Sequence, residues 1–582
     1  MVVREAEGYV FAAKLMDIRE RGCLTIQLNG HTIVFFAYGD DVYAVDNRCP
    51  HMGFPLDKGT VHDGILTCHW HHARFDLASG GTFDQWADDV PSFPVDVRGD
   101  EVWVDLRQRT DPLEHYRKRL RDGLERNLSL VVAKGVIHLL DGGIPADEPF
   151  RIGVEFGAKY RQSGWGQGLT ILACMRNLLP HLNREDHSRA LFHGLSAVAS
   201  DSSGAAPRFM VSPLPLESTD IPTLKRWFRQ FIEVRDDEGA ERCVISAIRA
   251  GADDKQMADM MFAAATDHRY IQIGHPLDFT NKAFETLDII GWEHAELVLS
   301  SLTHAYAVAD RMEESNAWRH PIDLIEILDQ TFEQLPDALE TGHSKRNAWG
   351  GRNALIPVLL DDDPQAIADS LLNALREGCT EEQLAGVVAY AAALRVARFH
   401  TSNDFGDWDT ALHTFTFANA VQHGLRRVNS FDLLRGVFDA AMSVYLDRFL
   451  NIPAARIPEP TETVDNPAVL LDELEALLNQ QQQVNQAAKL VALYLHSGGD
   501  ADALLAKLGY LLLREDRDFH TIQTIEAAFA QYQLLRGQPE AAHVLIAAAR
   551  YLAAHSPTVR RQGQVYQIAH RLARGEHLFE DE

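Results

Sequence analysis

The stretch from Cys49 to His71 constrains this chain most, because two short segments in it each hold one cysteine and one histidine. The first segment runs Cys-Pro-His from Cys49 to His51, sixteen residues follow it, and the second runs Cys-His-Trp-His from Cys68 to His71. Thiolates and imidazoles are ligands that several transition metals prefer. The pattern therefore predicts one metal centre held by two thiolates and two imidazoles from two loops.

A zinc site uses the same residue types, but zinc fingers take their ligands as a pair of cysteines and a pair of histidines. Here each segment supplies one residue of each kind. This division suits a [2Fe–2S] cluster in which two thiolates bind one iron and two imidazoles bind the other. Neutral imidazoles make such a cluster less negative and raise its reduction potential. The pattern favours the iron–sulfur cluster over zinc.

The stretch resembles the Rieske family, whose ligands follow the pattern C-x-H and C-x-x-H across a similar spacer. Arg-Phe-Asp at 74–76 and Gly-Gly at 80–81 follow the second segment, as in Rieske ferredoxins and ring-hydroxylating oxygenases. The resemblance covers about residues 8–107. It implies a small β fold that carries the cluster in two loops and transfers single electrons. The cluster ligands that it implies are Cys49, His51, Cys68 and His71.

The two loops depart from the Rieske proteins of respiratory complexes. They read CPHMGF and CHWHHARF, so they lack the extra cysteine pair and the serine that those proteins carry beside the cluster. Fewer hydrogen bonds to the cluster sulfurs imply a potential at the lower end of the Rieske range, about −150 mV. That implication matches the soluble ferredoxin and oxygenase branch of the family.

Residues 1–107 alternate between short apolar–polar runs and tight turns such as Asn29-Gly30 and Gly39-Asp40. This pattern predicts an all-β domain, a small sandwich or barrel. The expected strands are Tyr9–Ala13, Leu24–Leu28, His31–Ala37, Val42–Asp46, Ile65–Thr67, Val95–Arg98 and Glu101–Asp105.

The pattern changes to helical spacing after Pro112, except that Leu128–Leu140 suits a strand or a helix equally. We expect a connector at 108–164, a large all-α domain at 165–470 and a third helical unit at 471–582. The D-x-x-H-x4-H spacing that holds iron in ring-hydroxylating oxygenases does not occur. The helical part is therefore unlike the catalytic domain of those enzymes.

Three helical segments align with one another and predict duplicated multi-helix units. Each has a helix, a glycine, a second helix and then a histidine. The glycine and the polar residues after it are ordinary signals for the end of one helix and the start of the next. The glycines and histidines are Gly251 with His275, Gly378 with His400, and Gly498 with His520. The stretch HRYIQIGHPLDF around His275 also resembles questin-oxidase-like proteins, which are helical enzymes linked to oxygen insertion.

Carboxylates and imidazoles on bundle helices are how helical proteins build non-haem iron sites. We therefore consider a second metal site, although duplicated helices also keep such residues as caps and buried hydrogen-bonding groups. The candidate ligands are His275, Glu285, His304, His400 and His413.

Composition limits the partners of the chain. The net charge of −28 argues against nucleic acid and anionic membranes, and no apolar run is long enough to span a membrane. Six cysteines scattered along the chain favour a reducing, cytoplasmic location without a disulfide framework. No nicotinamide- or flavin-binding pattern is visible, so we expect the electrons to come from a separate reductase or ferredoxin.

The sequence thus predicts a Rieske-type oxidoreductase, most plainly an oxygenase that uses O2 on a small-molecule substrate. Its cluster would relay electrons to non-haem iron in the helical part. Two alternatives remain open. The helical part is a docking scaffold for a partner of an electron-transfer or redox-sensing protein, or it binds haem without covalent attachment.

Overall fold

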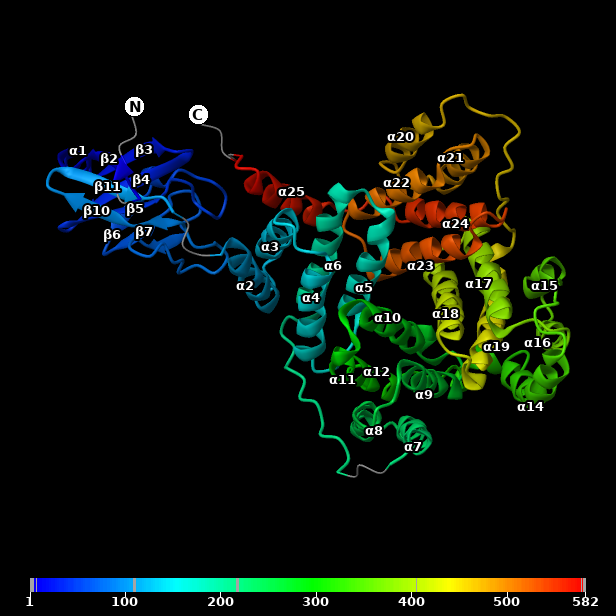
Figure 1. Ribbon diagram of the computed structural model, residues 1–582. Helices are drawn as coiled ribbons and strands as arrows, with labels where there is room; N and C mark the ends of the chain where they lie inside the picture. The colour runs from blue at the N-terminus through cyan, green and yellow to red at the C-terminus, as the bar shows by residue number, and fades with distance from the viewer. Residues whose placement is uncertain are drawn as a thin grey trace. The chain divides into compact units, whose positions relative to one another are not determined.

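A computed structural model describes residues 5–6, 8–107, 111–215, 219–404, 406–576 and 578. Residues 108–110 of the expected connector, and residues 577 and 579–582 of the expected third helical unit, lie outside that range. The chain divides into two compact units, residues 1–149 with 562–582 and residues 150–561. The β fold at the N-terminus and the large helical region that follows confirm the predicted fold class (Figure 1).

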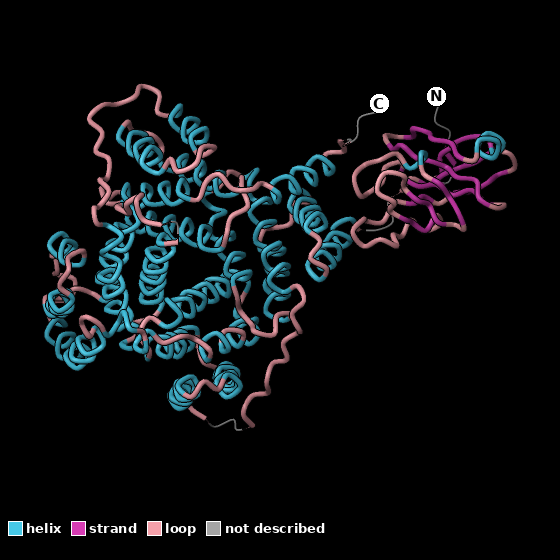
Figure 2. The backbone as a smooth tube through the Cα atoms, turned by 180° about the vertical axis from the view of Figure 1, so that it is seen from behind, coloured by secondary structure: helices cyan, strands magenta, loops and turns pink. Residues whose placement is uncertain are grey.

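The strands (magenta in Figure 2) belong to the first unit and form three antiparallel sheets, with the orders β1-β2-β11-β10, β3-β4-β5-β9 and β6-β7-β8. The predicted turns close two hairpins, because Leu28 pairs with His31 across Asn29-Gly30 and Tyr38 pairs with Asp41 across Gly39-Asp40. The strands are β1 Glu5–Ala6, β2 Tyr9–Lys14, β3 Cys23–Leu28, β4 His31–Tyr38, β5 Asp41–Asp46, β6 Thr60–His62, β7 Ile65–Thr67, β8 Arg74–Asp76, β9 Ser92–Phe93, β10 Val95–Arg98 and β11 Glu101–Asp105.

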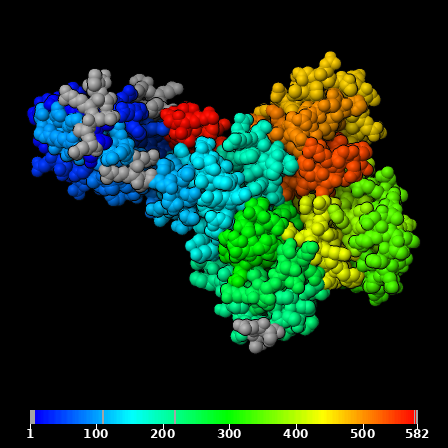
Figure 3. Space-filling model, in the orientation of Figure 1, coloured from blue at the N-terminus to red at the C-terminus, as the bar shows by residue number. Residues whose placement is uncertain are grey.

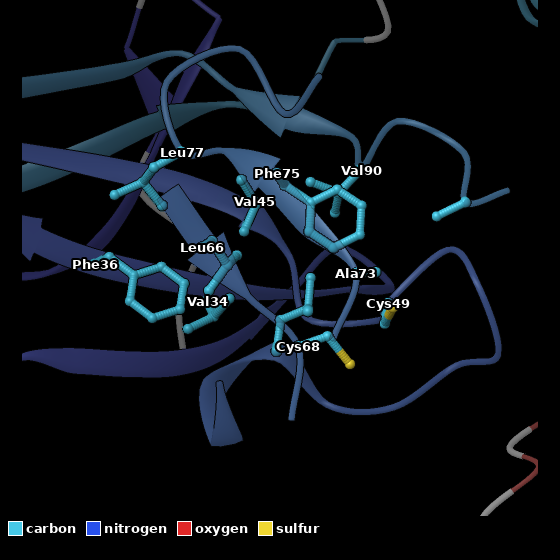
Figure 4. Packing of buried hydrophobic residues seen from close by; sticks show 12 residues of the cluster. Val34, Phe36, Val45, Cys49, Leu66, Cys68, Ala73, Phe75, Leu77 and Val90 are labelled. Atoms are coloured by element: carbon cyan, nitrogen blue, oxygen red, sulfur yellow. The ribbon is translucent and has the colours of Figure 1, made fainter. Parts of the chain in front are cut away.

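One of the two hydrophobic clusters in the β fold lies directly behind the predicted cluster loops. It contains Val34, Leu66 and Phe75, all fully buried, and it also contains Cys49 and Cys68. Figure 4 shows both cysteine side chains at one end of this packed group. The apolar strands therefore fix the backbone from which both thiols project.

Helices also belong to the first unit. They are α1 Leu15–Arg21, α2 Pro112–Glu125, α3 Ser129–Asp141 and α25 Arg561–Ala573, so the ambiguous stretch 128–140 is helical. Gly123 and Gly135 let α2 and α3 cross closely, since a Cβ atom at either would meet Val132 or Leu120 at 3.0–3.1 Å. The end of α25 contacts the first cluster loop, because Arg48 Nη2 donates to Leu572 O at 3.0 Å and Glu576 O at 2.8 Å (red residues in Figure 3).

The compact units therefore divide the chain differently from the expected boundaries. The expected connector at 108–164 supplies α2 and α3 to the first unit, and the last helix of the expected third unit also belongs there. Helical periodicity shows which face of a helix is apolar, but it does not show which neighbour covers that face.

Every regular element that the structure describes within residues 150–561 is helical. The first half contains α4 Asp147–Lys159, α5 Gln167–Leu178, α6 His187–Ser202, α7 Ile221–Glu233, α8 Asp237–Arg249, α9 Asp254–Asp267, α10 His275–Ile290, α11 Ala295–Ser300, α12 Thr303–Ala307, α13 Asn316–Arg319, α14 Leu324–His343 and α15 Arg352–Leu359. The second half contains α16 Pro364–Arg376, α17 Glu381–Ala397, α18 Asp407–Arg427, α19 Phe431–Leu446, α20 Ala468–Leu477, α21 Val484–His496, α22 Ala501–Leu513, α23 Phe519–Leu535 and α24 Ala541–Ala554.

The three glycines of the predicted repeat each lie between two helices. Gly251, Gly378 and Gly498 have φ values of +88°, +94° and +76°, the left-handed conformation that glycine adopts without strain. The helices α9, α17 and α22 follow these glycines directly. The helices after those are α10, α18 and α23, and α18 packs against both of the others (Figure 1). The duplication itself stays a prediction. No helix among the described residues has the length and apolar character needed to cross a membrane.

Candidate metal centres

The two cysteine–histidine loops of the first unit have the same backbone geometry. Cys49 N–H donates to Phe54 O at 2.8 Å, and Cys68 N–H donates to Ala73 O at 2.9 Å. Four residues after each cysteine, a backbone N–H donates back to the cysteine carbonyl, from Gly53 at 2.8 Å and from His72 at 3.0 Å. Gly53 and His72 both have positive φ, +83° and +63°. Two equivalent turns thus present one thiol and one imidazole each.

The four predicted ligands lie together in these loops. Cys49 and Cys68 are 2% and 1% exposed, and the ring centroids of His51 and His71 are 4.8 Å apart. Burial lowers the pKa of His51 to about 4 and also lowers that of His71. Both rings are therefore neutral at pH 7, the protonation state in which imidazole binds a metal.

Two further observations test whether these residues fit a [2Fe–2S] cluster. The hydrogen bond between the two thiols raises the pKa of Cys49 and lowers that of Cys68 to about 6, so one of the pair gives up its proton easily. Among the described residues, the buried His51 Nδ1 has no hydrogen-bond partner. A buried imidazole nitrogen without a hydrogen-bond partner, close to two thiols, is the arrangement expected of a metal ligand. These residues therefore fit the [2Fe–2S] cluster.

Charged residues from α2 and α3 lie against the first loop. Lys134 donates to Asp88 at 3.2 Å and to the backbone carbonyls of Pro50 and His51, and Arg119 donates to Asp88 at 2.7 Å. The ring of His51 lies 4.6 Å from that of Trp86, whereas His71 is exposed. The two histidines are therefore not equivalent, and His71 is the more accessible one.

A second group of histidines lies in the helical unit. His413 on α18 places Nε2 at 3.2 Å from Nε2 of His275 on α10 and at 3.2 Å from Nε2 of His520 on α23. All three ligand atoms lie within 4.8 Å of one another. Burial and the neighbouring rings lower the pKa of His275 to about 4 and that of His413 to about 3. We call this group the three-histidine cluster.

Hydrogen bonds among the three rings cannot pair all three Nε2 atoms of the three-histidine cluster at once. The Nε2 atom of a neutral imidazole either donates one hydrogen bond or accepts one, according to the tautomer. Nε2 of His413 faces two Nε2 atoms at the same distance, and it can pair with only one of them at a time. A cation shared by the three lone pairs removes this conflict, and three imidazoles are a common donor set for zinc and iron.

Asp409 lies behind the three-histidine cluster. Its carboxylate is 4.0 Å from Nδ1 of His520 and accepts a hydrogen bond of 3.2 Å from the hydroxyl of Tyr551. A separation of 4.0 Å is too long for a hydrogen bond, so the carboxylate acts on His520 through its charge. Asp409 also stands four residues before His413 on α18, the spacing that puts two residues on one helix face.

The structure brings together two of the five candidates from the sequence, His275 and His413. It places Glu285 ten residues along α10 from His275, about 15 Å along the helix axis. His304 pairs with Asp237 through a contact of 2.8 Å, and His400 Nδ1 contacts Ser402 Oγ at 2.6 Å. Glu285, His304 and His400 therefore do not join His275 and His413. His520 takes their place, and its alignment with His275 in the third segment was the signal for it.

Glu285 belongs to a buried ionic group that lies further along α10 and α23, two of the helices that carry the three-histidine cluster. Lys282 on α10 is 1% exposed and contacts Glu285 at 3.0 Å and Glu526 on α23 at 2.7 Å. Asn177 donates to both carboxylates, at 2.7 Å and 2.9 Å. Burial alone would lower the pKa of Lys282, but the two carboxylates outweigh it and raise that pKa, so the ammonium stays charged. This group ties α10 to α23.

Comparison with known proteins identifies the first unit. The model of the Rieske [2Fe-2S] domain matches residues 8–94. The ferredoxin component of the naphthalene 1,2-dioxygenase system of Pseudomonas aeruginosa is 26% identical over 101 residues, which are 17% of this chain and 97% of that protein. The ferredoxin subunit of the 3-phenylpropionate/cinnamic acid dioxygenase of Escherichia coli is 29% identical over 99 residues, 17% of this chain and 92% of that protein.

Among solved structures, the ferredoxin of carbazole 1,9a-dioxygenase from Nocardioides aromaticivorans is 27% identical, with a TM-score of 0.17. The match covers 17% of this chain and 100% of that ferredoxin chain. Residues 8–94 are therefore a Rieske [2Fe–2S] domain similar to the ferredoxin components of dioxygenase systems, which confirms the family resemblance read from the loops. The rest of the chain is helical.

Proposed function

We propose that this chain is a Rieske-type oxidoreductase, an oxygenase, whose cluster supplies single electrons to a metal bound by the three-histidine cluster. The observation that carries the proposal is the convergence of three Nε2 atoms from α10, α18 and α23 on one point, in a chain that also has a Rieske domain. An electron carrier with a purely structural helical part has no need of three imidazoles facing one another.

In the first unit, Cys49, His51, Cys68 and His71 would hold the [2Fe–2S] cluster. When bound, the cluster accepts and releases one electron at a time. Exposed His71 is the ligand that an external reductase or ferredoxin can approach, and we propose such a protein as the electron donor. The relatives of this domain are ferredoxin components of dioxygenase systems, which supports a role in electron transfer.

In the helical unit, His275, His413 and His520 would bind non-haem iron. Iron held by three imidazoles has coordination positions left for O2 and would supply the oxygen chemistry. The charge of Asp409 would favour a cation bound at His520, and the Tyr551 hydroxyl donates a hydrogen bond to Asp409. The neutral rings of His275 and His413 at pH 7 keep their lone pairs available to the metal.

Aromatic side chains beside the three-histidine cluster favour an apolar small-molecule substrate. The rings of Phe279 and Phe519 lie 5.4 Å and 5.6 Å from that of His275, and 6.0 Å from each other. Both side chains are buried, at 8% and 5% exposure. Apolar walls of this kind exclude water from the metal and bind hydrocarbon surface.

Metal analysis with electron paramagnetic resonance tests the proposal. The intact protein is expected to contain about two irons with acid-labile sulfide in the Rieske domain and about one further iron without sulfide. His413→Ala should remove only the further iron and leave the Rieske signal unchanged. His304→Ala is the matched control, because His304 pairs with Asp237 outside the three-histidine cluster.

Iron that is entirely sulfide-associated in the intact protein would contradict the second centre and favour an electron carrier with a docking scaffold. A haem absorption band that His413→Ala abolishes would replace non-haem iron with haem at the same histidines.

A further inference from the structure

A polar pocket in the helical unit has a wall that is rich in cations. Its volume is about 330 Å³, and it lies between the loop 452–467, helices α21 and α24, and the residues that follow α17. The polar side chains in its wall are His400, Thr401, Arg456, Asn485, Lys489 and Arg550. No carboxylate belongs to this wall among the residues that the structure describes. In a chain with a net charge of −28, such a wall is unusual.

Arg550 is the buried member of the wall. Its side chain is 1% exposed, Nη1 donates to Asn485 Oδ1 at 2.7 Å and Nη2 donates to Phe399 O at 2.6 Å. Its Nε has no hydrogen-bond partner within the described part of the chain. Burial lowers the pKa of this guanidinium to about 10, and no neighbouring charge offsets the effect.

Two other buried arginines contact a carboxylate, whereas Arg395, 4% exposed, donates to two backbone carbonyls and to Asn451. Arg119 is 7% exposed and contacts Asp88 at 2.7 Å, and Arg269 is 5% exposed and contacts Asp439 at 3.0 Å. A buried cation without an anion is strongly disfavoured unless something else supplies the negative charge. Arg550 is more deeply buried than Arg119 and Arg269 and lacks the counter-charge that both of them have.

The remaining donors of the wall are also suited to a negatively charged ligand. Lys489 stands four residues after Asn485 on α21, so the two share a helix face, and both side chains are exposed. His400 Nδ1 accepts a hydrogen bond of 3.2 Å from Ser402 N–H, so a neutral His400 carries its proton on Nε2 and is a further donor. Arg456 adds a second guanidinium from the loop, and this one is exposed.

We propose that this pocket binds an oxyanion, the carboxylate or phosphoryl group of a small molecule, with Arg550 as its buried anchor. A guanidinium presents its donors in a planar fork that matches two oxygens of either group. Lys489 and Arg456 would contribute charge at the open side of the pocket. None of His275, His413 and His520 belongs to the wall of this pocket.

Calorimetric titration of the full chain tests the site with inorganic phosphate and with succinate, each at a constant ionic strength set by sodium chloride. One anion should bind per chain. Lys489→Ala should weaken binding about tenfold, the usual effect of removing one charged hydrogen-bond donor. Lys255→Ala removes the same charge from an exposed position on α9 and should leave the affinity unchanged.

Arg550→Met should abolish binding, and the far-ultraviolet circular dichroism of the variant shows whether α24 and its neighbours still fold. Lys489→Ala keeps the test decisive if that variant does not fold, because Lys489 is exposed. Binding of phosphate alone identifies a phosphoryl ligand, and binding of succinate alone identifies a carboxylate. The proposal fails if neither anion binds at millimolar concentration, or if Lys489→Ala and Lys255→Ala bind the anion equally well.

Discussion

The Nε2 atom of His413 lies 3.2 Å from the Nε2 atom of His275, although 138 positions separate the two residues in the chain. His520 completes the group from a third helix, again at 3.2 Å from His413. Burial keeps the rings of His275 and His413 neutral, so their attraction to each other is weak, while their lone pairs face a common point. The fold therefore holds together three groups that gain most from a metal ion between them.

Replacing His520 tests whether the metal ligands are those of the three-histidine cluster or those that the sequence suggested. His520→Ala should lower the iron affinity of the helical unit by about tenfold or more, because the metal loses one of three imidazoles. His400→Ala should leave that affinity unchanged, since His400 contacts Ser402 instead. Competition with a chromophoric chelator measures both. Equal loss in the two variants would contradict the assignment.

Removing the charge of Lys134 should make the Rieske cluster harder to reduce. Its ammonium group contacts the backbone carbonyls of Pro50 and His51, so it favours the extra negative charge of the reduced cluster. Lys134→Met should lower the midpoint potential by on the order of 50 mV. A spectroscopic redox titration gives this value. Lys118→Met, an exposed lysine on α2, is the control and should shift the potential far less.

Removing Lys282 should destabilise the helical unit strongly. Without the ammonium, Glu285 and Glu526 face each other in the interior, and breaking a buried ion pair in this way costs about 3 kcal/mol. Lys282→Met should therefore lower the unfolding temperature at pH 7, and acid should partly restore it as the carboxylates take up protons.

The control for that variant is Lys507→Ala, whose partly exposed pair with Glu475 should contribute only about 0.5 kcal/mol. Thermal unfolding followed by circular dichroism compares the two. A Lys282→Met protein as stable as Lys507→Ala would show that the buried group does not tie α10 to α23.

Asp447 should make the helical unit less stable as the pH rises. Burial raises its pKa to about 7, whereas the unfolded chain has a value of about 3.9. Between these two values the folded state binds more protons than the unfolded state, so the stability contributed by this group falls as pH rises through that window. Asp447→Asn carries no titrating proton and should remove this dependence.

At pH 8 the Asp447→Asn variant should therefore unfold at a higher temperature than the unchanged protein, with a gain on the order of 2 kcal/mol. At pH 4.5, where the carboxyl group is largely protonated when folded, the two proteins should differ little. Thermal melts across this pH range check the sign, and a variant that is less stable at pH 8 would contradict it.

Local sequence signals predicted the β fold well. Strand alternation and the turns at Asn29-Gly30 and Gly39-Asp40 placed β4 and β5 within one residue of their observed bounds, because both signals act between near neighbours. The Rieske loops were visible for the same reason, since each supplies its thiol and imidazole from one short segment.

The three-histidine cluster could be predicted only in part. The aligned histidines pointed to the right helices, but alignment did not show that His413, rather than His400, faces the shared point. That choice depends on how α18 rotates against α10 and α23, which is a property of packing across more than a hundred residues. The return of α25 to the first unit was not predicted for the same reason.

The contact of Arg48 with the carbonyls of Leu572 and Glu576 has a consequence for biosynthesis. The first unit contains chain segments that precede and follow the helical unit in the sequence. A ribosome must therefore translate about four hundred intervening residues before it reaches α25. Throughout that interval the loop beside Cys49 lacks its final neighbour. Until then Arg48 has no Leu572 or Glu576 carbonyl to donate to.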